Sequence, residues 1–344
     1  MKSLKSIGLA IVALSSVASF STAFAGGVAQ PAGIFTVPVV GPNKLNLVAT
    51  PFARPAVAEG TISVQSGKVL TVSTVPTMTA GLPYVVEVLD GDYIGAISLI
   101  TANTGSTVTV EYNFPAGAIT AGTRYAIRPD WTISTLLGSA ATSQVGSSTS
   151  YGGGDVVSIF NSATQKLENF WRQRTGSSPN FAYTWRTQEG AVADNVRIPL
   201  GEGFVIKRVS ATQLNLRLAG EFRQARARKE ILGNGKLTII ANPNPYPLLL
   251  SKAGLTPTAA TSAGGAASAD NVHFINPNTG AFVTYWRNSS DNNNWYNAAG
   301  EPASATTIDA GKAVIMQRNG GRGDLTGKSA ARVNPVSVAN APGI

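Results

Sequence analysis

Few side chains in this chain are of the types that carry out acid–base or metal chemistry. Its 344 residues include a single histidine, His273, and no cysteine. A Ser-His-Asp triad would need that histidine together with a Gly-x-Ser-x-Gly turn, which the sequence lacks. One histidine also makes a metal site only with carboxylate partners. We therefore expect His273 to be a strand residue whose ring is hydrogen-bonded or solvated.

Paired carboxylates could serve a glycosidase, in which two acids flank the scissile bond. Asp155 and Asp270 are candidates because each precedes a β-forming run of similar sequence. Their place between a loop and a strand favours backbone capping, since aspartate accepts hydrogen bonds from nearby amides in turns. Asp90 and Asp92 surround Gly91, as in a hairpin turn, and no further calcium ligands alternate after them. The sequence therefore predicts no catalytic residue, metal or other cofactor.

Aromatic and basic residues are the remaining candidates, and they would bind a ligand without transforming it. Trp295 and Tyr296 follow three asparagines in a polar loop, where exposed rings could stack on a sugar. Arg223, Arg226 and Arg228 lie in a basic connector that is either a solvated link or a patch for a polyanion. These five are the predicted ligand-binding residues.

The elements that must position these residues include an internal repeat. Residues 155–172 align without a gap with residues 270–287, at a shift of 115 (270 − 155). Each copy predicts a β-hairpin: an apolar run, a turn rich in Asn, Ser or Thr, and a second run that ends in aromatic-Trp-Arg. Because Trp171 and Trp286 occupy equal positions on one strand face, we expect both to be core residues.

The spacing of a second repeated segment reveals an insertion. Residues 39–55, which we expect to include a hairpin with its turn at residues 41–43, align with residues 231–247 at a shift of 192 (231 − 39). The first copy therefore holds about 77 extra residues (192 − 115) before residue 155. Six β-forming runs fill them, which predicts a small antiparallel barrel or sandwich with adjacent termini. Those runs are residues 60–64, 68–72, 84–88, 94–100, 107–110 and 124–127. Near the end of each copy, residues 198–208 align with residues 308–318 at a shift of 110 (308 − 198).

Residues 1–25 have the plan of a secretory signal peptide. Lys2 and Lys5 precede an apolar run, and Ala23-Phe24-Ala25 forms a small-x-small cleavage site. No later segment is apolar for long enough to span a bilayer. The net charge is +9, and for an exported chain the anionic partners would be envelope polysaccharide, lipopolysaccharide or other proteins, not nucleic acid. We expect an extracellular, cell-surface or periplasmic location.

Composition and repeats together predict an all-β protein. Charged residues make up only 13% of the chain, whereas Gly, Ser, Thr, Asn and Ala are abundant. We predict two related β-sandwich-like or barrel-like repeat units, with a small β-barrel domain inserted in the first. The expected boundaries are residues 1–25 for the signal peptide, 34–55 and 131–222 for the first unit, 56–130 for the inserted domain, and 229–340 for the second unit.

Several motifs together resemble those of a known group of proteins. They are Trp131-Thr-x-x-x-Leu-Leu-Gly, the Asp-x-Val strand, Ile198-Pro-x-Gly-x-Gly-Phe-x-Ile-Lys-Arg, and Leu214-x-Leu-x-Leu-Ala-Gly. This pattern resembles an uncharacterised family of secreted, multi-paralogue β-rich proteins described from verrucomicrobial genomes. The resemblance implies export and a β architecture, and the family has no assigned activity or catalytic residues.

The leading functional hypothesis is an exported, non-catalytic structural protein of the cell surface or extracellular space. Its expected partners are further copies of the chain or envelope polysaccharide. A carbohydrate-binding or adhesive module is the alternative. A secreted hydrolase comes third, because it would need acids from different strands to line one cleft. The acids considered for that cleft are Asp155, Asp194, Asp270, Asp309, Glu189 and Glu202.

Overall fold

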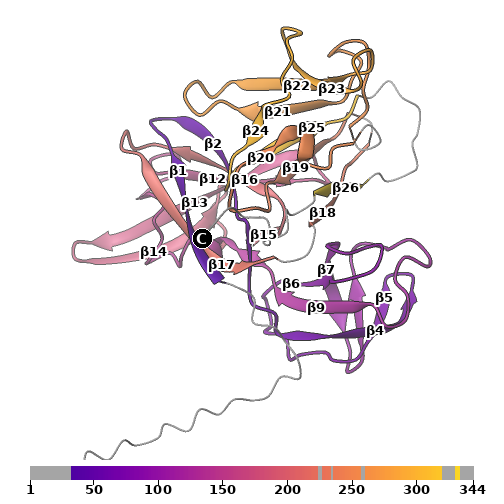
Figure 1. Ribbon diagram of the computed structural model, residues 1–344. Coiled ribbons are helices and arrows are strands. Elements are labelled where there is room, and N and C mark those ends of the chain that lie inside the picture. Colours follow the sequence, from indigo (N-terminus) through magenta and orange to yellow (C-terminus); the bar gives the residue numbers. More distant parts are fainter. Residues whose placement is uncertain (1–31, 224–226, 234, 257–259, 320–329, 334–344) are drawn as a thin grey trace, which may run out of the picture.

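The fold is all-β, as predicted. The computed structural model describes residues 32–223, 227–233, 235–256, 260–319 and 330–333 (Figure 1). Apart from one turn of helix, α1 (Ile133–Leu136), and a short 3₁₀ turn, η1 (Leu250–Lys252), every regular element in these residues is a strand. No helix in this part of the chain is both long and apolar enough to cross a membrane. The signal peptide predicted for residues 1–25 lies outside the described residues.

The two units are built on sheets with the same strand order. The first unit has the order β14-β13-β12-β16-β2, and the second has β23-β22-β21-β25-β19. The two predicted hairpins are β12–β13 and β21–β22. Trp171 and Trp286 are 6% and 5% exposed, so both are core residues as expected. The bounds are β2 (Lys44–Ala49), β12 (Val156–Asn161), β13 (Lys166–Ser177), β14 (Asn180–Thr187), β16 (Gly203–Arg208), β19 (Leu237–Ala241), β21 (Asn271–Ile275), β22 (Phe282–Asn288), β23 (Asn294–Asn297) and β25 (Ala313–Gln317).

Shorter strands complete each unit in matching pairs. In the first unit β1 pairs with β17, and β10 with β15; in the second β18 pairs with β26, and β20 with β24. In β17 the buried Leu216 and Leu218 alternate with exposed residues, as a strand with one face on a core requires. The bounds are β1 (Ala32–Val39), β3 (Phe52–Ala53), β10 (Trp131–Thr132), β11 (Ser147–Ser148), β15 (Arg197–Ile198), β17 (Leu214–Phe222), β18 (Ala227–Glu230), β20 (Leu248–Leu249), β24 (Thr307–Ile308) and β26 (Ala330–Val333).

The prediction of a hairpin around residues 41–43 is wrong. Strands β1 and β2 form there, but β1 pairs with β17 and β2 pairs with β16, so the two lie in different sheets. The buried Asn46 side chain binds both the N–H and the C=O of Val40, each at 2.9 Å. Because the side chain satisfies these backbone groups, the chain can leave one sheet and enter the other without a ladder between them.

The two units pack against each other through equivalent contacts. Ala49 N donates to Gly311 O at 2.9 Å, and Ala241 N donates to Gly201 O at 3.2 Å. These pairs are related by the repeat shifts, 192 (241 − 49) and 110 (311 − 201). The interface also has its own apolar cluster, in which β12 contributes Phe160. The units are therefore arranged with approximate two-fold symmetry, as an isologous pair would be.

The insertion forms a closed six-stranded barrel with the order β4-β5-β8-β7-β6-β9 (Figure 1, purple). All six predicted runs are strands of this barrel, and they enclose their own apolar core. Ala58 lies opposite Ile127, so the ends of the insertion are adjacent, as expected. The bounds are β4 (Ala58–Ser66), β5 (Val69–Val72), β6 (Tyr84–Val88), β7 (Ile97–Asn103), β8 (Thr107–Val110) and β9 (Arg124–Pro129).

Candidate functional site at the junction of the barrel and the two units

Trp295 is not available to a sugar, which corrects the sequence prediction for this residue. It is 2% exposed and belongs to the core of the second unit. Strand pairing explains this, because Trp295 lies opposite Arg287 in the sheet just as the buried Trp185 lies opposite Arg172. Tyr296 is half-buried; its ring packs 5.6 Å from that of Trp286 and its hydroxyl donates to Asp291 at 2.8 Å.

The basic connector, residues 220–230, holds the barrel and is no solvated link where it is described. Arg223 is 3% exposed and binds the barrel residue Glu87. The guanidinium of Arg228 lies 3.8 Å from the ring centre of Tyr93, and its Nη1 donates to the carbonyl of Asp92 at 2.9 Å. Arg223 is buried and bonded to the barrel, which corrects the polyanion-patch alternative for this residue. Arg228 is half-buried and uses one N–H donor and one face of its guanidinium on the barrel. Arg226 lies outside the described residues.

Four charges join the barrel to the first unit and the connector; three are buried and the fourth, Glu221, is 21% exposed. We call them the ionic brace. Arg128 Nε binds Glu87 at 2.9 Å, and Arg128 Nη1 binds Glu221 of β17 at 3.0 Å. Arg223 Nη2 binds the other oxygen of Glu87 at 2.8 Å. The Glu87 and Arg128 side chains are 2% and 1% exposed. Two acids and two bases make the brace neutral, so each buried charge is compensated by a neighbour.

The pKa of Glu87 depends on two opposing influences in the ionic brace, burial and the neighbouring arginines. Burial alone would raise it, because a carboxylate is poorly solvated inside the protein. The charges and hydrogen bonds of Arg223 and Arg128 together outweigh that effect and hold the pKa of Glu87 below its ordinary value of 4.5. The folded protein therefore binds this proton more weakly than the unfolded chain does.

We expect this shift to make stability fall in acid. The contribution of Glu87 is fully present above its unfolded pKa, near 4.5, and is lost as the pH falls through the lower folded pKa. Thermal unfolding of the wild type and of Glu87→Gln, followed from about pH 7 to about pH 3, checks this. The melting temperature should fall more steeply with decreasing pH in the wild type. Parallel curves for the two proteins would show that Glu87 does not carry the effect.

Asp155 and Asp270 hold matching loops in the two units, which confirms their predicted capping role. One oxygen of each carboxylate accepts a backbone N–H from the preceding loop, and the other accepts one from just beyond β16 in the first unit or β25 in the second. An arginine lies beside each carboxylate. The N–H donors are Gly146 and Val209 for Asp155, and Thr261 and Asn319 for Asp270, each at 2.8 Å, and the arginines are Arg208 and Arg318.

His273 is a hydrogen-bonded strand residue, as expected. Its Nδ1 lies 2.9 Å from Thr284 Oγ1, and its Nε2 lies 3.0 Å from Gln317 Oε1. The equivalent pair in the first unit is Ser158 and Asn169, which bond at 2.7 Å. Both ring nitrogens are therefore used within the sheet. Within the described ranges, no group of three or more His, Cys, Asp or Glu side chains could hold a metal ion.

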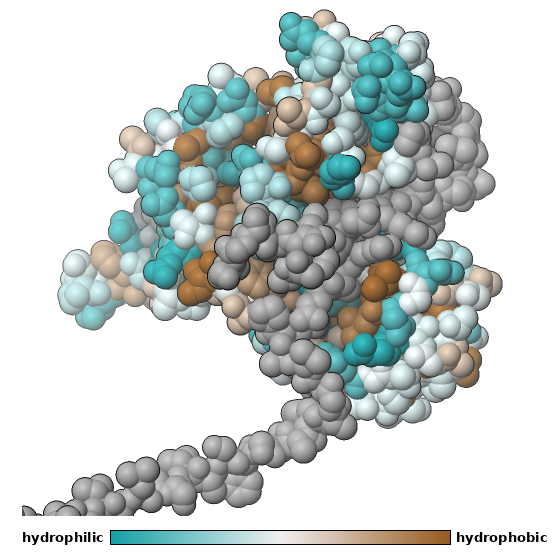
Figure 2. All heavy atoms as spheres, in the orientation of Figure 1, coloured by the Kyte–Doolittle hydropathy of each residue, from teal (hydrophilic) through white to brown (hydrophobic). Residues whose placement is uncertain are grey.

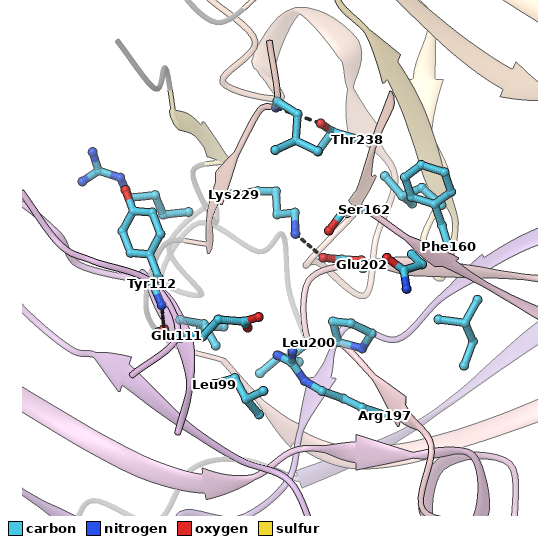
Figure 3. A pocket seen from close by; sticks show the side chains of 18 of the residues that line it. Leu99, Glu111, Tyr112, Phe160, Ser162, Arg197, Leu200, Glu202, Lys229 and Thr238 are labelled. Carbon is cyan, nitrogen blue, oxygen red and sulfur yellow. Dashed lines mark hydrogen bonds and ion pairs between the residues drawn. The ribbon is translucent and has the colours of Figure 1, made fainter. Parts of the chain in front are cut away.

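A cavity of about 540 Å³ lies where the barrel, the two units and the connector meet; we call it the junction cavity. In Figure 3 the side chains of Glu111, Glu202 and Lys229 point into the same space from different parts of the chain. Glu202 and Lys229 are joined by an ion pair. Of the six acids considered for a hydrolase, Glu202 lines this cavity, whereas Asp155 and Asp270 are the buried caps. The charged lining residues are Glu111, Glu168, Arg197, Glu202, Arg228 and Lys229.

Asp130, at the base of the barrel, binds Arg197, which lines the junction cavity. It is 1% exposed, lies where the chain returns from the barrel to the first unit, and binds Arg197 Nε at 2.5 Å. Burial raises the pKa of Asp130 above its ordinary value of 3.8, although Arg197 and the backbone N–H groups of Trp131 and Leu200 pull it down. Arg197 is 27% exposed, so one guanidinium both satisfies a buried acid and forms cavity wall.

Apart from Arg223, the charges of the ionic brace were not predicted from the sequence. A signal for two of them exists: Glu87 interrupts the apolar run Tyr-Val-Val-Glu-Val, and Arg128 ends the run Tyr-Ala-Ile-Arg. A charge inside a strand that is otherwise apolar is rarely buried without a partner of opposite sign. The lining residue Lys229 carries no comparable signal, because it stands between Arg228 and Glu230.

Comparisons with known proteins find no match for this chain. No family model, no curated protein and no solved structure is found to match the chain. The resemblance to the verrucomicrobial family therefore stays a prediction.

Proposed function

We propose that this chain is an exported, non-catalytic structural protein of the cell surface or extracellular space. The ionic brace is the observation that carries the proposal. The brace binds the barrel to the first unit and to the connector through Glu87, Arg128, Glu221 and Arg223. A separate apolar interface joins the two units. Such cross-links resist relative movement of the parts, which suits a building block more than an enzyme that must open and close.

Two exposed apolar side chains at equivalent positions would allow such a block to join further copies. Leu167 begins the second strand of the first hairpin and is 50% exposed; Phe282 is its equivalent, at a shift of 115 (282 − 167), and is 63% exposed. On the face in Figure 2, hydrophobic side chains form small separate groups among hydrophilic ones. Two matching contact points on one molecule permit a chain of subunits, whereas one point permits only a pair.

Negative-stain electron microscopy of the purified protein tests this proposal. We expect filaments or sheets, and we expect the double variant Leu167→Ser, Phe282→Ser to lose them. Val192→Ser is the control, because Val192 is 64% exposed but lies outside the two hairpins. Single particles at every protein concentration, or assemblies that survive the double variant, would argue against the proposal.

A carbohydrate-binding module is the second candidate, and the junction cavity is the observation that favours it. The aromatic pair first considered for sugar binding is engaged inside the second unit. The cavity instead offers carboxylates, cations and apolar walls around one partly open space. Such a mixture is typical of sites that bind small polar molecules.

A further inference from the structure

The junction cavity does not share the positive charge of the whole chain. Three glutamates and three basic residues line it, in a protein whose net charge is +9. Glu202 is paired with Lys229, and Arg197 is paired with the buried Asp130 behind the wall. Glu111, Glu168 and Arg228 remain, with an excess of one negative charge. The cavity therefore has no net attraction for an anion.

The polar groups in the cavity wall offer both hydrogen-bond acceptors and donors. The Glu111 side chain reaches the cavity from the barrel and is exposed. Glu168, on the first unit, accepts an amide hydrogen bond from Asn161 at 2.7 Å and is also exposed. Ammonium and guanidinium groups supply donors at Lys229 and Arg197. A hydroxyl group can accept from one set and donate to the other at once.

The wall also has apolar side chains from the barrel and from both units. Leu99 lies on the barrel side, Phe160, Pro199 and Leu200 lie on the side of the first unit, and Ile239 lies on that of the second. Figure 3 shows Leu99 and Leu200 near Glu111 and Arg197. An apolar surface next to polar groups suits a molecule with C–H faces and hydroxyl edges.

We propose that the junction cavity is a binding site for a neutral saccharide. The volume of about 540 Å³ falls within the range of ligand pockets, about 300–1,000 Å³. The glutamates of the wall disfavour uronic acids, whose carboxylates would add further negative charge to the cavity. A neutral sugar matches the donors, the acceptors and the apolar wall, and it would be held between the barrel and the first unit.

Isothermal titration calorimetry of the purified protein tests the site. Maltotriose, cellotriose and mannotriose are the neutral probes; trigalacturonic acid and a chitosan trimer are the anionic and cationic ones. We expect saturable binding of at least one neutral trisaccharide. Glu111→Gln should weaken it by about tenfold, because a charge-assisted acceptor is lost. Glu189→Gln is the matched control, since Glu189 is exposed and does not line the cavity.

A second pair of variants tests the position of the ligand. Ser162 lines the cavity, and its exposed neighbour Ala163 does not. Ser162→Trp should therefore abolish binding by filling the cavity, and Ala163→Trp should leave it unchanged. The proposal is overturned if no neutral trisaccharide binds, if a charged probe binds more tightly, or if Glu111→Gln and Glu189→Gln have equal effects.

Discussion

Replacing Arg128 by methionine is expected to lower the free energy of unfolding by about 3–5 kcal/mol. Arg128 is 1% exposed and bonds to two carboxylates and to the carbonyl of Arg54, at 2.9–3.0 Å. Methionine keeps much of the volume but leaves Glu87 buried with only Arg223 to compensate it. A buried carboxylate that loses a partner costs far more than an exposed one. Urea denaturation followed by circular dichroism measures the change.

Two further variants separate lost charge compensation from lost packing. Arg124→Met lies on the same strand at an exposed position, and it should change stability by no more than about 0.5 kcal/mol. The double variant Glu87→Gln, Arg128→Met should lose less than the sum of the single losses, by about 1 kcal/mol or more, because fewer unmatched charges remain. Additive losses would show that the ionic brace does not act as a unit.

Trp295→Ala should lower the free energy of unfolding by about 3–5 kcal/mol, and so should Trp185→Ala. The two indoles are 2% and 0% exposed, and each fills the core of its own unit. Removing either ring leaves a cavity that the rigid sheet cannot close. Thermal unfolding and urea denaturation of both variants measure the loss.

The same variant, tested for both stability and retention on polysaccharide, decides whether Trp295 contacts a polysaccharide. Phe282→Ala, at a position that is 63% exposed, is the control and should change stability by no more than about 0.5 kcal/mol. Below its melting temperature, Trp295→Ala should be retained on immobilised polysaccharide to the same extent as the wild type. Unchanged stability together with a selective loss of retention would instead place this ring on a binding surface.

The repeat in the sequence contains more information about Trp295 than its local surroundings do. The neighbouring asparagines suggest an exposed loop, but the shift of 110 found for residues 198–208 also relates Trp185 to Trp295 (295 − 185). Both tryptophans lie opposite the arginine that follows Trp171 or Trp286 in the neighbouring strand. A tryptophan repeated at a constant shift serves the shared fold, so this relation predicts burial for both.

Local patterns could not predict which distant residues meet. The strands, the barrel and the capping acids follow from alternation, turn residues and spacing, because these depend on neighbours along the chain. The bonds of Glu87 span 41 residues to Arg128 and 136 residues to Arg223. No local pattern encodes such pairs, since the first forms only when β6 pairs with β9 and the second only when the connector docks on the barrel.

The sequence by itself determined the all-β class, the two related units, the inserted barrel, and the roles of Asp155, Asp270 and His273. Each of these depends on residue type and on short or regular spacing. The tertiary structure alone decided that β1 and β2 enter different sheets, that the connector arginines bind the barrel, and that Glu111, Glu202 and Lys229 face one cavity. The physical reason is that a charge or an edge strand takes the partner that the folded chain brings near, and this partner can lie anywhere in the sequence.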